Sequence, residues 1–200
     1  DLLTVMRNEM NTLDIARIQH DVNRVYHFFD QILYFDFYRQ VPVKIHVFEN
    51  RTLYNRYLAQ RTNADLPETL GIFLSRDNEI AVYLHPEKLG GLDSTYATIR
   101  HEASHAILFS LSQRVPDWLN EGLAEQMETL DEHKGAFQIG RHDGNRKAVL
   151  YYREQMPPVL EFVEVRNGQW RHGNRKGLNQ GMAGQLVFML ISLLLGVLFA

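Results

Sequence analysis

Five consecutive residues, His101-Glu102-Ala103-Ser104-His105, combine the side chains that a hydrolytic metal site requires. Residues four apart lie on the same helix face, one turn apart, so both imidazoles can reach one cation. Glu102 flanks that cation without replacing either histidine, which suits a base acting on a water molecule. The pattern therefore predicts a metal site on a helix, with Glu102 as general base.

The sequence around this motif indicates that its helix is buried. Apolar residues occur on nearly every side of the expected helix: Ile99, Ala103, Ala106, Ile107, Leu108, Phe109 and Leu111. Burying two histidines and a carboxylate is costly unless a charge such as a divalent cation compensates them. The alternative is a pair of core histidines bonded to Glu102 or to backbone carbonyls. We expect the metal site.

A catalytic zinc ion usually takes three protein ligands, and a downstream helix offers carboxylates for the third. This helix is expected from Pro116-Asp117 to about Leu130, with three acidic residues on one side: Glu121, Glu125 and Glu128. Glu121 is the expected ligand, because a connection of a few residues returns its helix antiparallel to the histidine helix. Gly122 would let these two backbones approach closely. Glu128 is expected to be merely solvated.

Together the two segments resemble the gluzincin metallopeptidases, especially the small peptidase MA-like domains. The likeness rests on His-Glu-Ala-Ser-His at 101–105 and Trp-Leu-Asn-Glu-Gly-Leu-Ala-Glu at 118–125. It implies a zinc-dependent peptidase in which His101, His105 and Glu121 hold one Zn²⁺ ion. It also implies that Glu125 orients a ligand histidine, which agrees with the need to fix a ligand's tautomer.

Gluzincins usually add a tyrosine or histidine that supports the oxyanion, and the resemblance does not identify it here. The downstream candidates are Tyr151, Tyr152, His142 and His172, of which Tyr152 is our expectation for a catalytic role. Packing on a helix is the alternative for the two tyrosines. The two histidines lie among arginines and lysines, which fits a solvated loop or, at a cleft, a preference for acidic substrates.

Composition limits the partners of this chain of 200 residues. A net charge of −3 provides no basic field for nucleic acid, so we expect a peptide or protein substrate instead. Cysteine is absent, which leaves histidine, aspartate and glutamate as metal ligands. A catalytically inactive, metal-binding interaction domain is the alternative to an enzyme, and the intact Glu102 favours the enzyme.

The order of the expected elements predicts an α+β fold in one domain, 1–200, with an α/β lobe over 1–92. Apolar spacing predicts a helix over 15–32, and alternation predicts a strand over 43–47. A helix over 51–61 and a hairpin over 71–75 and 79–84 follow. The second hairpin strand is either an interior strand or an edge that binds an extended peptide.

A mostly helical lobe is expected over 93–200. Its histidine helix begins near Asp93 or Ser94 and runs to about Ser112, while 133–145 reads as a loop and 146–155 as a helix. Residues 182–200 carry no charge, and 186–200 are almost wholly apolar. We expect a buried terminal helix there; the alternative is a membrane anchor, which would indicate a membrane-associated processing protease.

Overall fold

The computed structural model describes residues 13–35, 37, 42–62, 69–165, 170 and 175–194. The fold is α+β, as the sequence predicts, and the chain forms two compact units, Asp1–Leu111 and Ser112–Ala200. The sequence places the division between residues 92 and 93 instead. The boundary lies further along because the long helix α3 (Gly91–Leu111) packs against the sheet and the first helix of unit 1.

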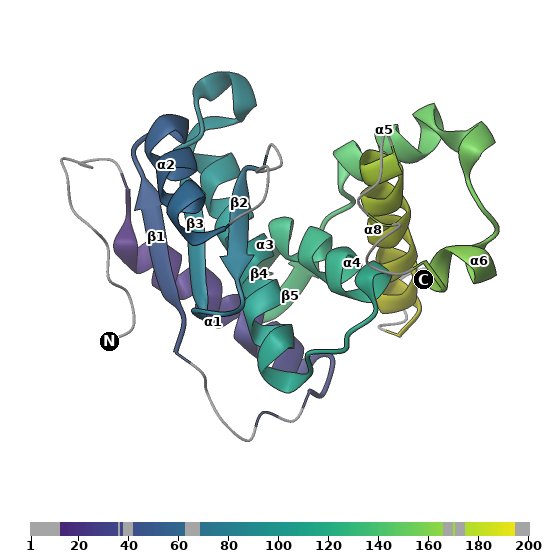
Figure 1. Ribbon diagram of the computed structural model, residues 1–200. Coiled ribbons are helices and arrows are strands. Elements are labelled where there is room, and N and C mark those ends of the chain that lie inside the picture. Colours follow the sequence, from purple (N-terminus) through teal and green to yellow (C-terminus); the bar gives the residue numbers. More distant parts are fainter. Residues whose placement is uncertain are drawn as a thin grey trace. The chain divides into compact units, whose positions relative to one another are not determined.

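Unit 1 contains a three-stranded sheet with the order β1-β3-β2 (Figure 1). β1 (Lys44–Phe48) runs parallel to β3 (Glu79–Tyr83), and β2 (Gly71–Leu74) runs antiparallel to β3. The hairpin between β2 and β3 is confirmed, and Asn78 takes a positive φ of 52° in its turn. Of the two alternatives for the second hairpin strand, the interior one is right. The two edge strands of this sheet are β1 and β2.

Alternating side chains let both faces of this sheet be covered. Helices α1 (Ile15–Gln31) and α3 pack on one face, and α2 (Arg51–Arg61) packs on the other. The first face is built around Ile18, Ile45, Val47, Ile80, Val82, Tyr96, Ile99, Ala103 and Ala106. The second is built around Tyr54, Leu58, Ala81 and Tyr83. Because successive residues of a strand point to opposite sides, these sets alternate along β3.

Glu79, the first residue of β3, is a buried carboxylate on the sheet face that α2 covers. Glu79 is 5% exposed, and it accepts hydrogen bonds from Tyr57 at 2.5 Å, Arg61 at 3.2 Å and Lys44 at 3.5 Å. Nε2 of His46 lies 3.5 Å from the same group. Burial alone would raise the pKa of Glu79, but the Tyr57 hydrogen bond and the surrounding positive charges outweigh it and lower the pKa.

Unit 2 is organised around its last helix, α8 (Arg175–Leu194), against which α4 (Asp117–Glu128) and α5 (Asp143–Tyr151) pack. A short helix α6 (Val159–Val163) follows α5. Two single turns of 3-10 helix complete the helical elements described: Glu87–Leu89 in unit 1 and Arg153–Gln155 in unit 2.

The expected loop over 133–145 is wrong. Strands β4 (Leu130–His133) and β5 (Ala136–Ile139) form an antiparallel hairpin there, and α5 already begins at Asp143. The two turn residues, Lys134 and Gly135, have φ values of 53° and 78°. Two successive positive φ angles are typical of the tight turns that join hairpin strands, and lysine is an unusual residue for the first of them.

α8 is about half buried over the residues that the structure describes. Lys176–Leu194 is long and apolar enough to cross a membrane, but half of this window is buried inside the protein. The buried side consists of Leu178, Met182, Ala183, Val187 and Ile191. The other side exposes Met189, Leu190, Leu193 and Leu194, so the expected buried terminal helix stays a prediction. Residues 195–200 lie outside the described residues, so the membrane anchor remains a prediction.

Candidate metal centre

The helix that carries the histidine motif is anchored by a buried ion pair. Nη1 of Arg100 lies 2.8 Å from Asp21 of α1, and Arg24 contacts the other oxygen of the same carboxylate at 2.5 Å. Burial lowers the pKa of Arg100, and the charge of Asp21 opposes this effect. Because a buried guanidinium requires such a partner, this pair ties α1 to α3 next to His101.

His101 and His105 lie one turn apart on α3, as their spacing predicts. Their ring centroids are 4.9 Å apart, with an angle of 80° between the ring planes. His101 and Glu102 are 8% and 7% exposed, so the helix is buried at the motif as expected. Both imidazoles therefore project from the same side of α3, where His101 is buried and His105 is partly buried.

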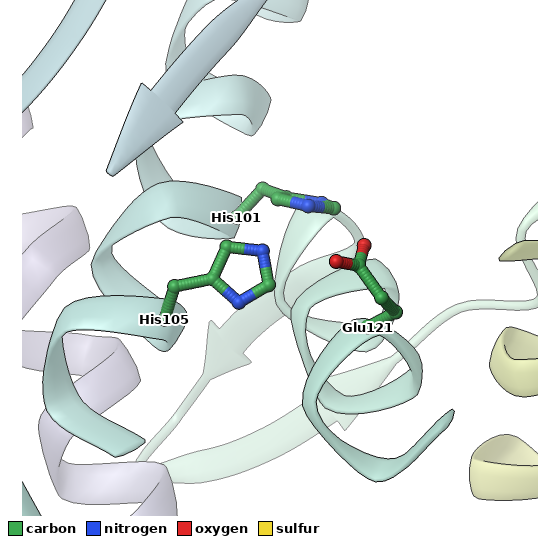
Figure 2. Close-up of side chains that lie close together, drawn as sticks. All are labelled: His101, His105 and Glu121. Carbon is green, nitrogen blue, oxygen red and sulfur yellow. The ribbon is translucent and has the colours of Figure 1, made fainter. Parts of the chain in front are cut away.

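Glu121 completes a group of donors able to hold a metal ion. One ligand atom each from His101, His105 and Glu121 all lie within 4.8 Å of one another. Figure 2 shows the two imidazole rings and the carboxylate turned toward the same space. The sequence proposed these three residues as ligands, and the structure brings their donor atoms together.

Gly122 has a different role from the one expected. A Cβ atom at this position would lie 2.6 Å from the backbone oxygen of Ala183 and would also overlap Val187, both on α8. Gln126, one turn further along α4, donates a hydrogen bond of 2.8 Å to the Gly184 carbonyl. Gly122 therefore allows α4 to approach α8, and this close packing fixes the helix that carries Glu121.

Glu125 and Glu128 continue the acidic side of α4. Glu125 is 6% exposed. One ligand atom each from His101, Glu125 and Glu128 also lie within 4.8 Å of one another. Glu128 is not merely solvated, because Nε2 of His142 lies 3.0 Å from its carboxylate. The orienting role for Glu125 remains a prediction.

His142 is built into the start of α5. Its Nδ1 accepts a hydrogen bond of 3.3 Å from the backbone N–H of Asn145, so it caps the helix. Since Nδ1 is the acceptor, the proton of the neutral ring is on Nε2, which donates to Glu128. Sequence reasoning treated His142 as an oxyanion candidate or a loop residue. The only local sign that His142 caps α5 is its position three residues before Asn145, the residue whose backbone N–H it accepts.

The general-base candidate lies against the first residue of β2. A Cβ atom at Gly71 would lie 3.2 Å from Cγ of Glu102 and 2.6 Å from Cγ2 of Thr98. Tyr54 of α2 is 1% exposed, and burial raises its pKa to about 12, with the charge of Glu102 among the smaller contributions. Sequence reasoning missed Gly71, because nothing local distinguishes a glycine at a strand start from one in a turn.

The other oxyanion candidates belong to unit 2. Tyr152 follows the end of α5 and packs, partly buried, on the cluster that contains Phe162 and Leu178. Tyr151 is 81% exposed. His172 lies outside the described residues. The catalytic role of Tyr152 therefore remains a prediction, and its contacts within this unit are those of a packing aromatic.

Comparison with known proteins adds no family assignment. A scan against protein-family models finds no match for this chain, and a search of curated proteins finds no matching sequence. The resemblance to gluzincins, which is strongest over residues 96–126, therefore stays a prediction.

Proposed function

We propose that this protein is a zinc-dependent peptidase. The observation that carries the proposal is the convergence of His101, His105 and Glu121, whose ligand atoms all lie within 4.8 Å of one another. Two neutral imidazoles and one carboxylate form a donor set that catalytic zinc sites use, with a fourth position left for water. The partial burial of the three donors adds support, because a cation compensates polar groups that water reaches only in part.

The chemistry divides between the ion and Glu102. A bound zinc ion lowers the pKa of water to about 7 and polarises the scissile carbonyl. Glu102 accepts the proton of the attacking water and then delivers it to the leaving amine. Its position next to His101, on a helix held by the Arg100–Asp21 pair, keeps the carboxylate beside the donor group.

The sheet supports a peptide as the substrate. Among the described residues β2 pairs only with β3, so its other edge offers backbone N–H and C=O groups. β2 begins at Gly71, in contact distance of Glu102. An extended peptide that adds to this edge would place its backbone beside the general base.

The test combines metal analysis with a single substitution. We expect the purified protein to retain about one zinc ion per chain after dialysis and to cleave unfolded casein in a chelator-sensitive way. Glu102→Gln should retain zinc and lose hydrolysis, because the amide cannot accept the proton. Glu132→Gln, in the exposed β4 strand, is the matched control and should remain active.

Two results would contradict the proposal. A fully active Glu102→Gln variant would reject the general base. A wild-type protein that retains zinc but cleaves nothing would instead favour a metal-binding domain that acts only through a partner.

A further inference from the structure

The two residues that precede β2 are held by buried side chains from other parts of unit 1. The hydroxyl of Tyr54 lies 2.7 Å from Oγ1 of Thr69. Nε2 of His85 lies 3.3 Å from the carbonyl oxygen of Leu70. Tyr54 and His85 are 1% and 5% exposed. The entry to the strand is therefore tethered twice, once to α2 and once to the segment that follows β3.

His85 is itself fixed by the first turns of α3. Its backbone N–H donates to Thr95 at 2.9 Å, and its Nδ1 lies 3.0 Å from Oγ of Ser94. A carbonyl oxygen can only accept, so Nε2 carries a proton and donates it to Leu70. His85 thus connects the start of α3 to the start of β2 through side-chain contacts with Ser94 and Leu70.

Through His85, the start of α3 is linked to the strand that packs on Glu102 of the same helix. α3 carries Glu102, and its first turns hold His85, which holds Leu70. The next residue, Gly71, packs on Glu102. The segment Leu70–Gly71 therefore contacts α3 twice, indirectly through His85 and directly at Glu102. Tyr54 and His85 therefore restrain the entry to this edge strand in addition to its ladder with β3, since β2 has only four residues and pairs with β3 alone among the described strands.

We propose that Tyr54 and His85 are positioning residues, which hold the β2 edge beside Glu102 so that an extended peptide can bind to it. This inference rests on the proposed peptidase function. Strand addition gains affinity from backbone hydrogen bonds, and a disordered edge must be ordered at the expense of binding. Loss of the Tyr54–Thr69 or His85–Leu70 hydrogen bond should therefore weaken peptide binding and leave the metal in place.

The experiment compares two polar substitutions of His85. In His85→Gln the side-chain amide reaches the position of Nε2 and can still donate to Leu70. In His85→Asn the amide replaces only Nδ1, so the bond to Leu70 is lost while a partner for Ser94 remains. Each is made in the Glu102→Gln background, and binding of a fluorescein-labelled casein decapeptide is measured by anisotropy. Hydrogen exchange of residues 70–74 and zinc content are measured on the same samples.

We expect His85→Asn to weaken peptide binding about tenfold and to accelerate exchange over 70–74, with zinc content unchanged. His85→Gln should stay within about twofold of the His85 parent. Tyr54→Phe, which removes the bond to Thr69, should reproduce the effect of His85→Asn. A purely structural role would instead lower thermal stability in these variants without the selective loss of binding and its rescue by glutamine.

The experiment can reject the positioning role of Tyr54 and His85 separately from the peptidase function. Equal peptide affinity in the asparagine and glutamine variants, with 70–74 exchanging faster only in the former, would overturn the positioning role even if the enzyme is active. Unchanged exchange over 70–74 in both would show that His85 does not restrain the strand, which also overturns it. A wild-type protein that binds zinc but neither binds nor cleaves peptides would reject the proposed function, and with it any role in positioning a substrate.

Discussion

Gly71 in β2 and Glu102 in α3 pack so closely that a Cβ atom at position 71 would lie 3.2 Å from Cγ of Glu102. The same atom would lie 2.6 Å from Thr98 and 2.8 Å from Val82, which real Cβ atoms do not do without a shift of their neighbours. The absence of a side chain at position 71 therefore lets the edge strand approach Glu102 this closely.

Gly71→Ala should displace β2 from α3 or rotate Glu102. We expect kcat/KM for casein peptides to fall about tenfold, which corresponds to about 1.4 kcal/mol of transition-state stabilisation. The free energy of unfolding should fall by about 1–3 kcal/mol, as in other overpacked cores. Zinc content should not change, because the ligand side chains are not the ones displaced.

The control for this prediction is Gly177→Ala in α8. A Cβ atom there would meet nothing closer than 4.0 Å, so we expect no loss of stability or activity. If Gly71→Ala behaved like this control in peptide assays and urea unfolding, the close packing against Glu102 would have no functional weight.

Glu121→Ala should remove the metal and leave the fold. We expect zinc affinity to fall by more than about 100-fold, because loss of an outer hydrogen-bonding partner alone costs about 10–100-fold. Competition with a chromophoric chelator measures it. Glu132→Ala, on exposed β4, is the matched loss of one carboxylate and should keep wild-type affinity. Equal affinity in the two variants would move the third ligand elsewhere.

The local part of the fold is predictable from the sequence. Helix α1 follows from apolar spacing and from Asp14, whose side chain accepts the Arg17 N–H, and α2 follows from Asn50 in the same way. The motif predicts that His101 and His105 share a helix face, because that relationship depends only on the helical repeat.

The remaining features depend on tertiary packing, which spacing does not encode. Gly122 indicates a close backbone approach, but only the structure shows that the partner is α8. The β4–β5 hairpin escapes detection because Lys134 stands where asparagine or glycine is usual. The boundary after Leu111 arises from the packing of α3 on the sheet. Because α3 is apolar on nearly every side, its sequence does not show which elements it packs against.

Asp21→Ala should be strongly destabilising, because it leaves the Arg100 guanidinium buried without its carboxylate. Breaking a buried pair by removing one partner costs about 3–5 kcal/mol. A second Arg–Asp pair joins the same two helices, Arg17–Asp93 at 3.1 Å, but the Asp93 side chain is 87% exposed. Asp93→Ala should cost at most about 1 kcal/mol. Chemical unfolding of both variants without metal tests the contrast, and equal losses would contradict it.

Glu79→Gln should lower stability in a way that depends on pH. Near neutral pH the ionised Glu79 accepts hydrogen bonds from Tyr57, Arg61 and Lys44, and we expect the variant to lose about 1.5–3 kcal/mol. The pKa of Glu79 is lowered in the folded protein, so its contribution is fully present above its ordinary pKa of 4.5. It is lost as the pH falls through the lowered folded value.

The free-energy difference between wild type and Glu79→Gln should therefore be constant above about pH 5 and shrink progressively below it. Urea unfolding of metal-free protein measures this, since metal binding by the proposed histidine ligands would add its own acid dependence. Glu132→Gln, whose parent side chain is exposed, should show no such slope. A Glu79→Gln difference that persists unchanged at the acid end would mean that the charge of Glu79 contributes nothing and that only its packing stabilises the sheet.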